Sequence, residues 1–145
     1  MLTVAHWALL FAAPLAAQDE AQKELARLQG DWVVVSAEAN GQKLPADVTK
    51  DLTLTLTKDN RFVTRRGSEQ PRSGTYKVDL TKKPHTMDVT LEAGPDKGKT
   101  QLAIYVLEKD TLQICSGPPD SKDRPADFET KGKKDLTVLH LKRKS

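Results

Sequence analysis

The sequence from Trp32 to Arg143 is a succession of short segments in which apolar and polar residues alternate between turn signals. The clearest is Leu52-Thr53-Leu54-Thr55-Leu56-Thr57, which places leucines on one face of a strand and threonines on the other. Strands are predicted at residues 32–39, 52–57, 61–65, 74–79, 85–92, 101–107, 111–115 and 135–143. Residues 101–107 are mostly apolar on both faces, so we expect this strand to be covered on both sides. Short strands at this spacing, joined mainly by hairpins, are typical of an all-β barrel.

A short helix is predicted before the first strand. Asp19 can cap it, an apolar stripe runs toward Gln29, and Gly30 can end it. Gly30-Asp31-Trp32 then opens the β region, and we expect Trp32 to plug the closed end of the barrel because of its large ring. A chain of 145 residues has room for one such domain. The prediction is one all-β, eight-stranded, up-and-down barrel over residues 18–145, with the N-terminal helix over one end.

Residues 1–17 predict export. They contain no Asp, Glu, Lys or Arg, and their apolar run at residues 7–13 is too short to span a bilayer comfortably. We interpret them as a secretory signal peptide cut between Ala17 and Gln18, after which no stable membrane insertion is expected. The alternative is an N-terminal membrane anchor that is never cut. The predicted location is periplasmic or extracellular.

The composition excludes few partners by itself. A net charge of +3 does not indicate a nucleic acid or a membrane without a concentrated patch. Arg61, Arg65, Arg66 and Arg72 flank one hairpin and its loop and could form an anion-attracting rim. Aromatic residues are not interleaved with these arginines, so we expect a solvated face and no nucleic-acid partner. The protein is expected to be a monomer.

No motif indicates catalysis, a metal or a cofactor. Residues 93–100 fit a relaxed phosphate-loop pattern, but Pro95 lacks an amide donor and the next segment reads as a strand, which favours a hairpin loop. A metal site would need His85, His140 and a carboxylate such as Asp88; two partly exposed strand histidines are the favoured interpretation. Cys115 is the only cysteine, which excludes an internal disulfide and favours a small buried hydrophobe. We therefore expect no enzyme.

A barrel of eight strands is wide enough to hold one small ligand or to be filled by its own side chains. The first hypothesis is an exported binding protein for a small apolar molecule, with Trp32 closing the floor. The candidate lining residues are Leu54, Phe62, Tyr76, Met87 and Ile104. The alternative is a filled barrel that acts as a structural or protein-interaction module with no small-molecule ligand. An enclosed apolar void of ligand size would favour the first.

The connection from Gly117 to Lys134 is long, charged and interrupted by three prolines. Connections of this length inside a domain are commonly functional or mobile. We expect it to be weakly protected, anchored against the barrel by Phe128, and the natural lid if the barrel carries a ligand.

Several unrelated motifs support a resemblance. They are Leu28–Trp32, Asn40–Pro45, Gly74–Tyr76, Gly94–Thr100, Ile114-Cys115 and Arg124-Pro125, in this order. Over about Glu24 to Arg143 the chain resembles an uncharacterised lipocalin-like domain family abundant in planctomycete-type bacteria. The resemblance implies a lipocalin-like barrel and an export context, but no activity. In lipocalins the tryptophan after this glycine pairs with an arginine near the last strand, which implies structural roles for Gly30, Trp32 and Arg143, with Arg124 as the rival arginine.

Overall fold

The computed structural model describes residues 15–133 and 135–145, so most of the predicted signal peptide lies outside the described residues. The elements are α1 (Leu15–Leu28), β1 (Gly30–Ala39), β2 (Gln42–Lys43), α2 (Ala46–Thr49), β3 (Leu52–Leu56), β4 (Arg61–Arg66), β5 (Arg72–Asp79), β6 (His85–Leu91), β7 (Thr100–Leu107), β8 (Thr111–Ser116) and β9 (Thr137–Arg143).

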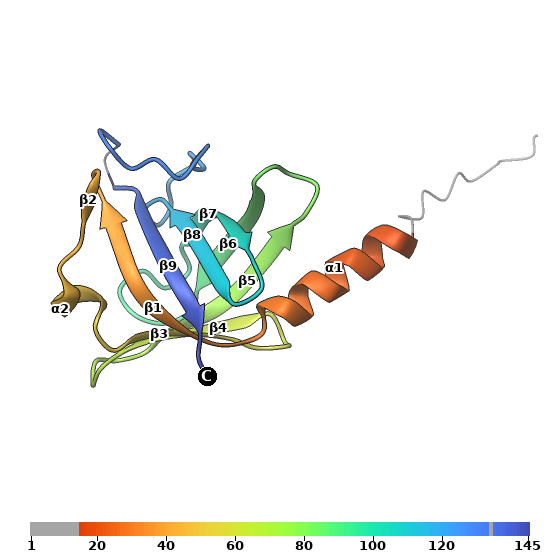
Figure 1. The fold of residues 1–145 in the computed structure, drawn as a ribbon, viewed down its shortest axis with the longest axis horizontal. Coiled ribbons are helices and arrows are strands. Elements are labelled where there is room, and N and C mark those ends of the chain that lie inside the picture. Colours follow the sequence, from red (N-terminus) through yellow and green to blue (C-terminus); the bar gives the residue numbers. More distant parts are fainter. Residues whose placement is uncertain (1–14, 134) are drawn as a thin grey trace, which may run out of the picture.

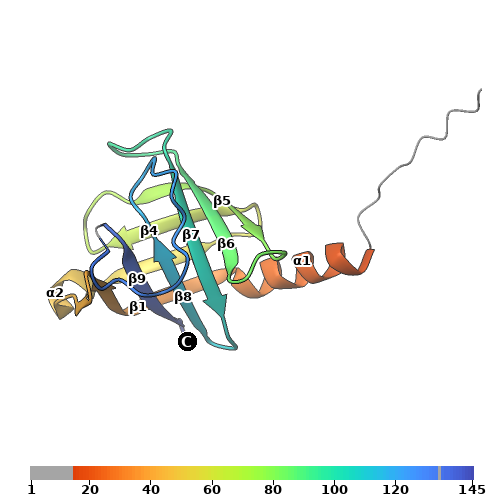
Figure 2. The same cartoon turned by 90° about the horizontal axis from the view of Figure 1, so that it is seen from above.

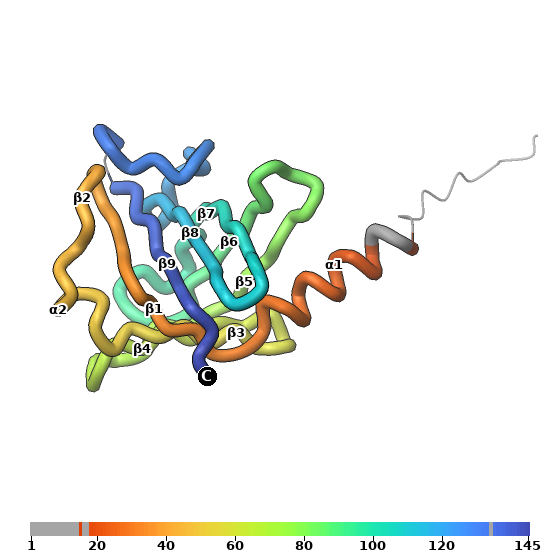
Figure 3. The backbone as a smooth tube through the Cα atoms, in the orientation of Figure 1, coloured from red at the N-terminus to blue at the C-terminus, as the bar shows by residue number. Residues whose placement is uncertain are grey.

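Strands β1 and β3–β9 form a closed, eight-stranded antiparallel barrel (Figure 1). Each strand pairs with the next along the chain, and β1 then pairs with β9 to close the ring. The closing pair runs from Trp32 opposite Arg143 to Ala39 opposite Thr137, with a register shift between Val34 and Ser36. The backbone trace in Figure 3 follows these hairpins around the barrel. The predicted all-β, up-and-down barrel is confirmed.

Two small elements in the connection after β1 were not predicted. The two-residue strand β2 pairs with Glu38 and Ala39 across the Asn40-Gly41 turn. Both turn residues have positive φ, which Asn and Gly tolerate best. Helix α2 packs against β1, and the pairing of β1 with β3 ends at Val33.

Helix α1 begins at Leu15, earlier than predicted, and the predicted cleavage point falls in its first turn. Its last turns hold it to the barrel, where Glu24 and Leu28 are buried. The rest of the helix points away from the barrel, on the side opposite α2 (Figures 1 and 2). Among the described residues, no helix combines the length and apolar character needed to cross a membrane.

The barrel has apolar clusters on both sides of its wall. The larger one lies inside the barrel and includes Trp32, Phe62, Tyr105 and Leu141. The smaller one lies on the outer face and consists of Ile104, Cys115 and Val138, with Phe128 packed against it. Strand β7 contributes to both clusters, which agrees with the expectation that this strand is covered on both sides. The predicted anchoring of the long connection by Phe128 is confirmed.

Candidate functional site

A cavity of about 400 Å³ lies inside the barrel. It is lined by Val48, Leu52, Leu54, Leu56, Phe62, Thr64, Arg66, Glu69, Gln70, Arg72, Tyr76, Met87, Val89, Leu91, Gln101, Ala103, Ile114, Ser116, Thr137 and Leu139. The outermost of these, such as Arg66, Ser116 and Thr137, stand at the strand ends farthest from the pairing of Trp32 with Arg143. The cavity therefore opens at the end opposite Trp32.

The alternation of β3 and β4 places residues in this cavity. Leu54 pairs with Thr64 and Leu56 pairs with Phe62, so these side chains share the inner face. Leu56 and Phe62 are buried at the depth of the cavity, whereas the following inward positions of β4 toward the mouth are the half-buried Thr64 and then the exposed Arg66. The lining thus changes from apolar at depth to polar at the mouth.

The mouth carries two arginines, one glutamate, two glutamines and three hydroxyl side chains. Arg72 donates from Nη2 to Asp96 Oδ2 at 3.1 Å, so its charge is already partnered. Gln101 donates from Nε2 to the carbonyl of Gly117 at 2.7 Å. Among the described residues, neither Arg66 nor Glu69 has an ion-pair partner within 4.0 Å.

The structure brings four of the predicted lining residues together. Leu54, Phe62, Tyr76 and Met87 all line the cavity. Trp32 lies beneath it, fully buried and outside the lining.

Ile104 lies on the outer face of the barrel instead, in the cluster with Cys115. Its strand is apolar on both faces, so alternation alone could not show which residues point inward. The inward residues of β7 are its neighbours Ala103 and Tyr105, which belong to the interior cluster. Leu91 and Ile114 also line the cavity but were not among the predicted lining residues. Alternation within their strands could have identified them, because Leu91 shares a face of β6 with Met87 and Ile114 shares a face of β8 with Leu112.

The closed end is built around Trp32. Its Nε1 donates to the carbonyl of Leu28 at 2.9 Å, and the Arg143 guanidinium carbon lies 4.3 Å from the ring centroid. Arg143 also donates from Nη1 to the carbonyl of Gln29 at 3.0 Å and from Nη2 to that of Arg27 at 2.7 Å. One guanidinium thus covers the tryptophan and satisfies two carbonyls at the helix end.

Gly30 makes room for this arrangement. Its φ of +124° is a conformation that side-chain-bearing residues rarely adopt, and a Cβ there would lie 3.2 Å from Arg143 Nη1. Arg124 lies elsewhere, donating to Asp88 Oδ1 at 2.6 Å and to the carbonyl of Ala103 at 2.9 Å. Of the two candidate arginines, Arg143 is the partner of Trp32.

A buried polar cluster joins α1 to the barrel beside this floor. Tyr105 donates its hydroxyl to Glu24 Oε1 at 3.2 Å, and His85 Nδ1 lies 3.6 Å from the same oxygen. Arg27 donates to the other carboxylate oxygen at 3.2 Å. Burial, and secondarily the Glu24 carboxylate, raise the pKa of Tyr105 far above its ordinary range. Glu24 therefore anchors the helix to the barrel through Tyr105.

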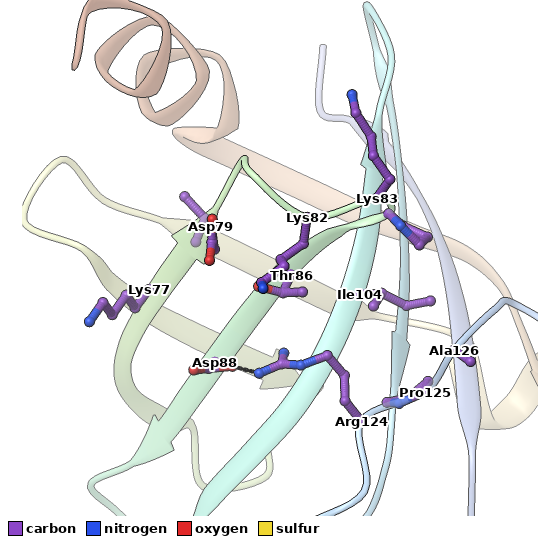
Figure 4. A pocket seen from close by; sticks show the side chains of 12 residues that line it. Lys77, Asp79, Lys82, Lys83, Thr86, Asp88, Ile104, Arg124, Pro125 and Ala126 are labelled. Atoms are coloured by element: carbon purple, nitrogen blue, oxygen red, sulfur yellow. Dashed lines mark hydrogen bonds and ion pairs between the residues drawn. The ribbon is translucent and has the colours of Figure 1, made fainter. Parts of the chain in front are cut away.

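A second hollow, of about 490 Å³, lies on the outer face between the β5–β6 hairpin and residues 124–126 (Figure 4). Both carboxylates in this hollow already have partners within the protein. Asp88 forms an ion pair with Arg124, and Asp79 accepts hydrogen bonds from the backbone N–H and the hydroxyl of Thr81. The remaining charges are Lys77, Lys82 and Lys83 at the rim of the hollow. We take the barrel cavity as the candidate site because it combines a closed floor, an apolar depth and a polar mouth.

The predicted lid, residues 117–133, lies outside the cavity lining, and its closure over a ligand stays a prediction. Asp120 donates its backbone N–H to the carbonyl of Thr100 at 2.8 Å. The buried Thr130 donates its hydroxyl to Glu38 Oε1 at 2.8 Å and accepts the Gly41 N–H at 2.9 Å. The segment is bound along the outside of the wall because it covers the outer apolar cluster.

The phosphate-loop pattern, Cys115 and the candidate metal ligands from the sequence can now be placed in the structure. Residues 92–99 connect β6 to β7, and the element that follows is a strand, as expected of a hairpin loop. Cys115 is fully buried, and burial raises the pKa of its thiol. Across residues 15–133 and 135–145, no group of three or more His, Cys, Asp or Glu side chains is arranged to hold a metal ion.

Comparison of the chain with protein-family models, with curated proteins and with solved structures returned no match. The resemblance to a lipocalin-like family therefore stays a prediction, and the fold and the cavity carry the functional argument.

Proposed function

We propose that this protein is an exported binding protein that takes a small apolar molecule into the barrel cavity. The observation that carries the proposal is the 400 Å³ void above Trp32, open at one end. Ligand sites in proteins commonly have volumes of about 300–1,000 Å³ and mostly apolar walls. A filled barrel, the alternative interpretation, would leave no such space between its inward side chains.

The chemistry of the lining supports an apolar ligand body. The deep walls are formed by Leu54, Leu56, Phe62, Met87 and Ile114. Among the described residues, no buried side-chain nitrogen or oxygen lacks a hydrogen-bond partner. The depth of the cavity therefore offers a ligand no unsatisfied polar anchor, and the gain on binding comes from removing apolar surface from water.

Uptake of a neutral fluorescent probe tests the proposal. N-phenylnaphthylamine should bind and fluoresce in the folded protein because it is apolar and uncharged. Val89→Phe should weaken its binding, since Val89 lines the cavity and the larger ring fills it. The matched control is Val35→Phe, because Val35 is 57% exposed and lies outside the lining. Thermal unfolding should first show that both variants are folded.

The natural ligand can be sought by native mass spectrometry of protein purified from its own host. A bound mass that dissociates on unfolding would support the proposal. A folded barrel that takes up no probe, or variants with equal affinity for it, would contradict it and favour the structural or interaction module.

Export rests on the uncharged apolar run of residues 1–17. The mature chain from the host should begin at or near Gln18. An intact Met1 in that material would contradict cleavage and favour the uncut anchor.

A further inference from the structure

We infer that the ligand is amphipathic and anionic: an apolar chain enters the barrel and its single negative head group stays at the mouth beside Arg66. This inference rests on the proposed function and adds the chemical class and the orientation of the ligand.

The register of β4 directs Arg66 to the mouth. Arg66 pairs with Leu52, and each lies two residues from an inward position of its own strand, Arg66 from Thr64 and Leu52 from Leu54. Arg66 belongs to the cavity lining, whereas its neighbour Arg65, opposite Thr53, does not. One arginine of this adjacent pair therefore stands over the cavity and the other faces away from it.

The other charges at the mouth leave Arg66 as the available cation. Arg72 is held by Asp96, which also pairs with Lys99 at 3.2 Å. Glu69 is the one carboxylate in the lining, and it belongs to the exposed turn after β4. Within the part of the chain that the structure describes, Arg66 makes no ion pair. A guanidinium without a partner recognises a planar carboxylate well, because it can donate two parallel hydrogen bonds.

The polarity gradient fixes the orientation. Hydroxyl and amide groups of Thr64, Gln70, Ser116 and Thr137 surround the mouth, while the floor is sealed by apolar side chains above Trp32. A charged group at the floor would lose its hydration without a partner, which is costly, whereas at the mouth it keeps water and gains Arg66. The head group therefore stays outward and the chain points to the floor.

The test compares ligands that differ only in their head group. Decanoate, decanol and decyltrimethylammonium compete for bound N-phenylnaphthylamine at neutral pH and low salt. Decanoate should bind about fivefold more tightly than decanol, because a partly exposed ion pair contributes modestly. Added salt should reduce this preference. The cationic analogue should bind most weakly.

Two arginine variants locate the effect. Arg66→Gln should remove the preference, so that the ratio of the affinities for decanoate and decanol within that variant falls to about one. Arg65→Gln, the adjacent outward-facing control, should keep the wild-type ratio. Equal binding of decanoate and decanol by the wild-type protein, or equal effects of the two variants, would overturn the inference. If the probe itself does not bind, the proposed function fails, and this outcome is separate from a lost head-group preference.

Discussion

The guanidinium of Arg143 lies 4.3 Å from the centre of the Trp32 ring, joining the last strand of the barrel to the first. The two residues are opposite one another at the end of the β1–β9 pairing that closes the barrel. Arg143 also donates to two carbonyls at the C-terminal end of α1, so one side chain connects the floor, the helix and the closing strand.

Arg143→Ala should lower the free energy of unfolding by about 1–3 kcal/mol, since the cation–π contact and two hydrogen bonds are lost together. Arg143→Lys should recover only part of this loss, because an ammonium keeps the charge but not the planar fork. Urea unfolding measures both effects. The adjacent, exposed Lys142 provides the control: Lys142→Ala should change stability by less than about 0.5 kcal/mol. Equal effects at the two positions would contradict a structural role for Arg143.

Trp32→Ala should be among the most damaging substitutions, costing about 3–5 kcal/mol because a fully buried ring is deleted. Trp32→Phe should cost less, since it mainly removes the hydrogen bond from Nε1 to Leu28.

Fluorescence gives an independent check on Trp32. The sequence has two tryptophans, and Trp7 lies in the segment predicted to be cut. A chain without residues 1–17 should therefore emit at short wavelength when folded and shift to the red in urea. Water-like emission from the folded protein would show that the floor is open.

Tyr105 should make the protein lose stability at alkaline pH. Burial and the nearby Glu24 carboxylate raise the pKa of its hydroxyl, whereas the unfolded chain releases that proton near pH ~10. A raised folded-state pKa contributes stability that is fully present below about pH 10 and is lost as the pH rises toward the folded-state pKa. The free energy of unfolding should therefore fall more steeply above about pH 10 in the wild type than in Tyr105→Phe.

Tyr76→Phe is the control for this pH dependence. Burial alone raises the pKa of Tyr76, and its hydroxyl lies 3.5 Å from the carbonyl of Thr57. We expect a smaller change of slope than for Tyr105→Phe. Identical pH slopes for the wild type and Tyr105→Phe would show that the pKa of Tyr105 is not raised in the folded protein.

Thr130→Val should release the long connection from the barrel wall. The substitution keeps the shape but leaves the Gly41 N–H and the Glu38 carboxylate without their partner, at a cost of about 1–3 kcal/mol. Hydrogen exchange within residues 117–133 should accelerate, while exchange in β3 and β4 should not. Thr55→Val, which removes an exposed hydroxyl bonded to Asp31, should have little effect. Unchanged exchange in Thr130→Val would mean that Phe128 and Arg124 hold the segment by themselves.

The sequence alone determined the eight barrel strands and their order. Strict alternation at Leu52–Leu56 and the Asn40-Gly41 turn depend on neighbouring residues, so they can be recognised without knowing the rest of the fold. The same local pattern placed Leu54, Phe62, Tyr76 and Met87 on inward faces. Their position in the cavity follows from the closure of the barrel.

Only the tertiary structure decided which side of β7 faces inward, where the long connection lies, and which arginine reaches Trp32. Ile104 and Tyr105 are neighbours in a strand with apolar residues on both faces; Tyr105 faces the interior, whereas Ile104 lies in the outer cluster against which Phe128 packs. The pairing of Trp32 with Arg143 likewise requires β9 to meet β1, a contact between residues far apart in the sequence. Periodicity reports how a strand's two faces differ. Which face becomes the interior is fixed only when the barrel closes and the remaining segments pack against it.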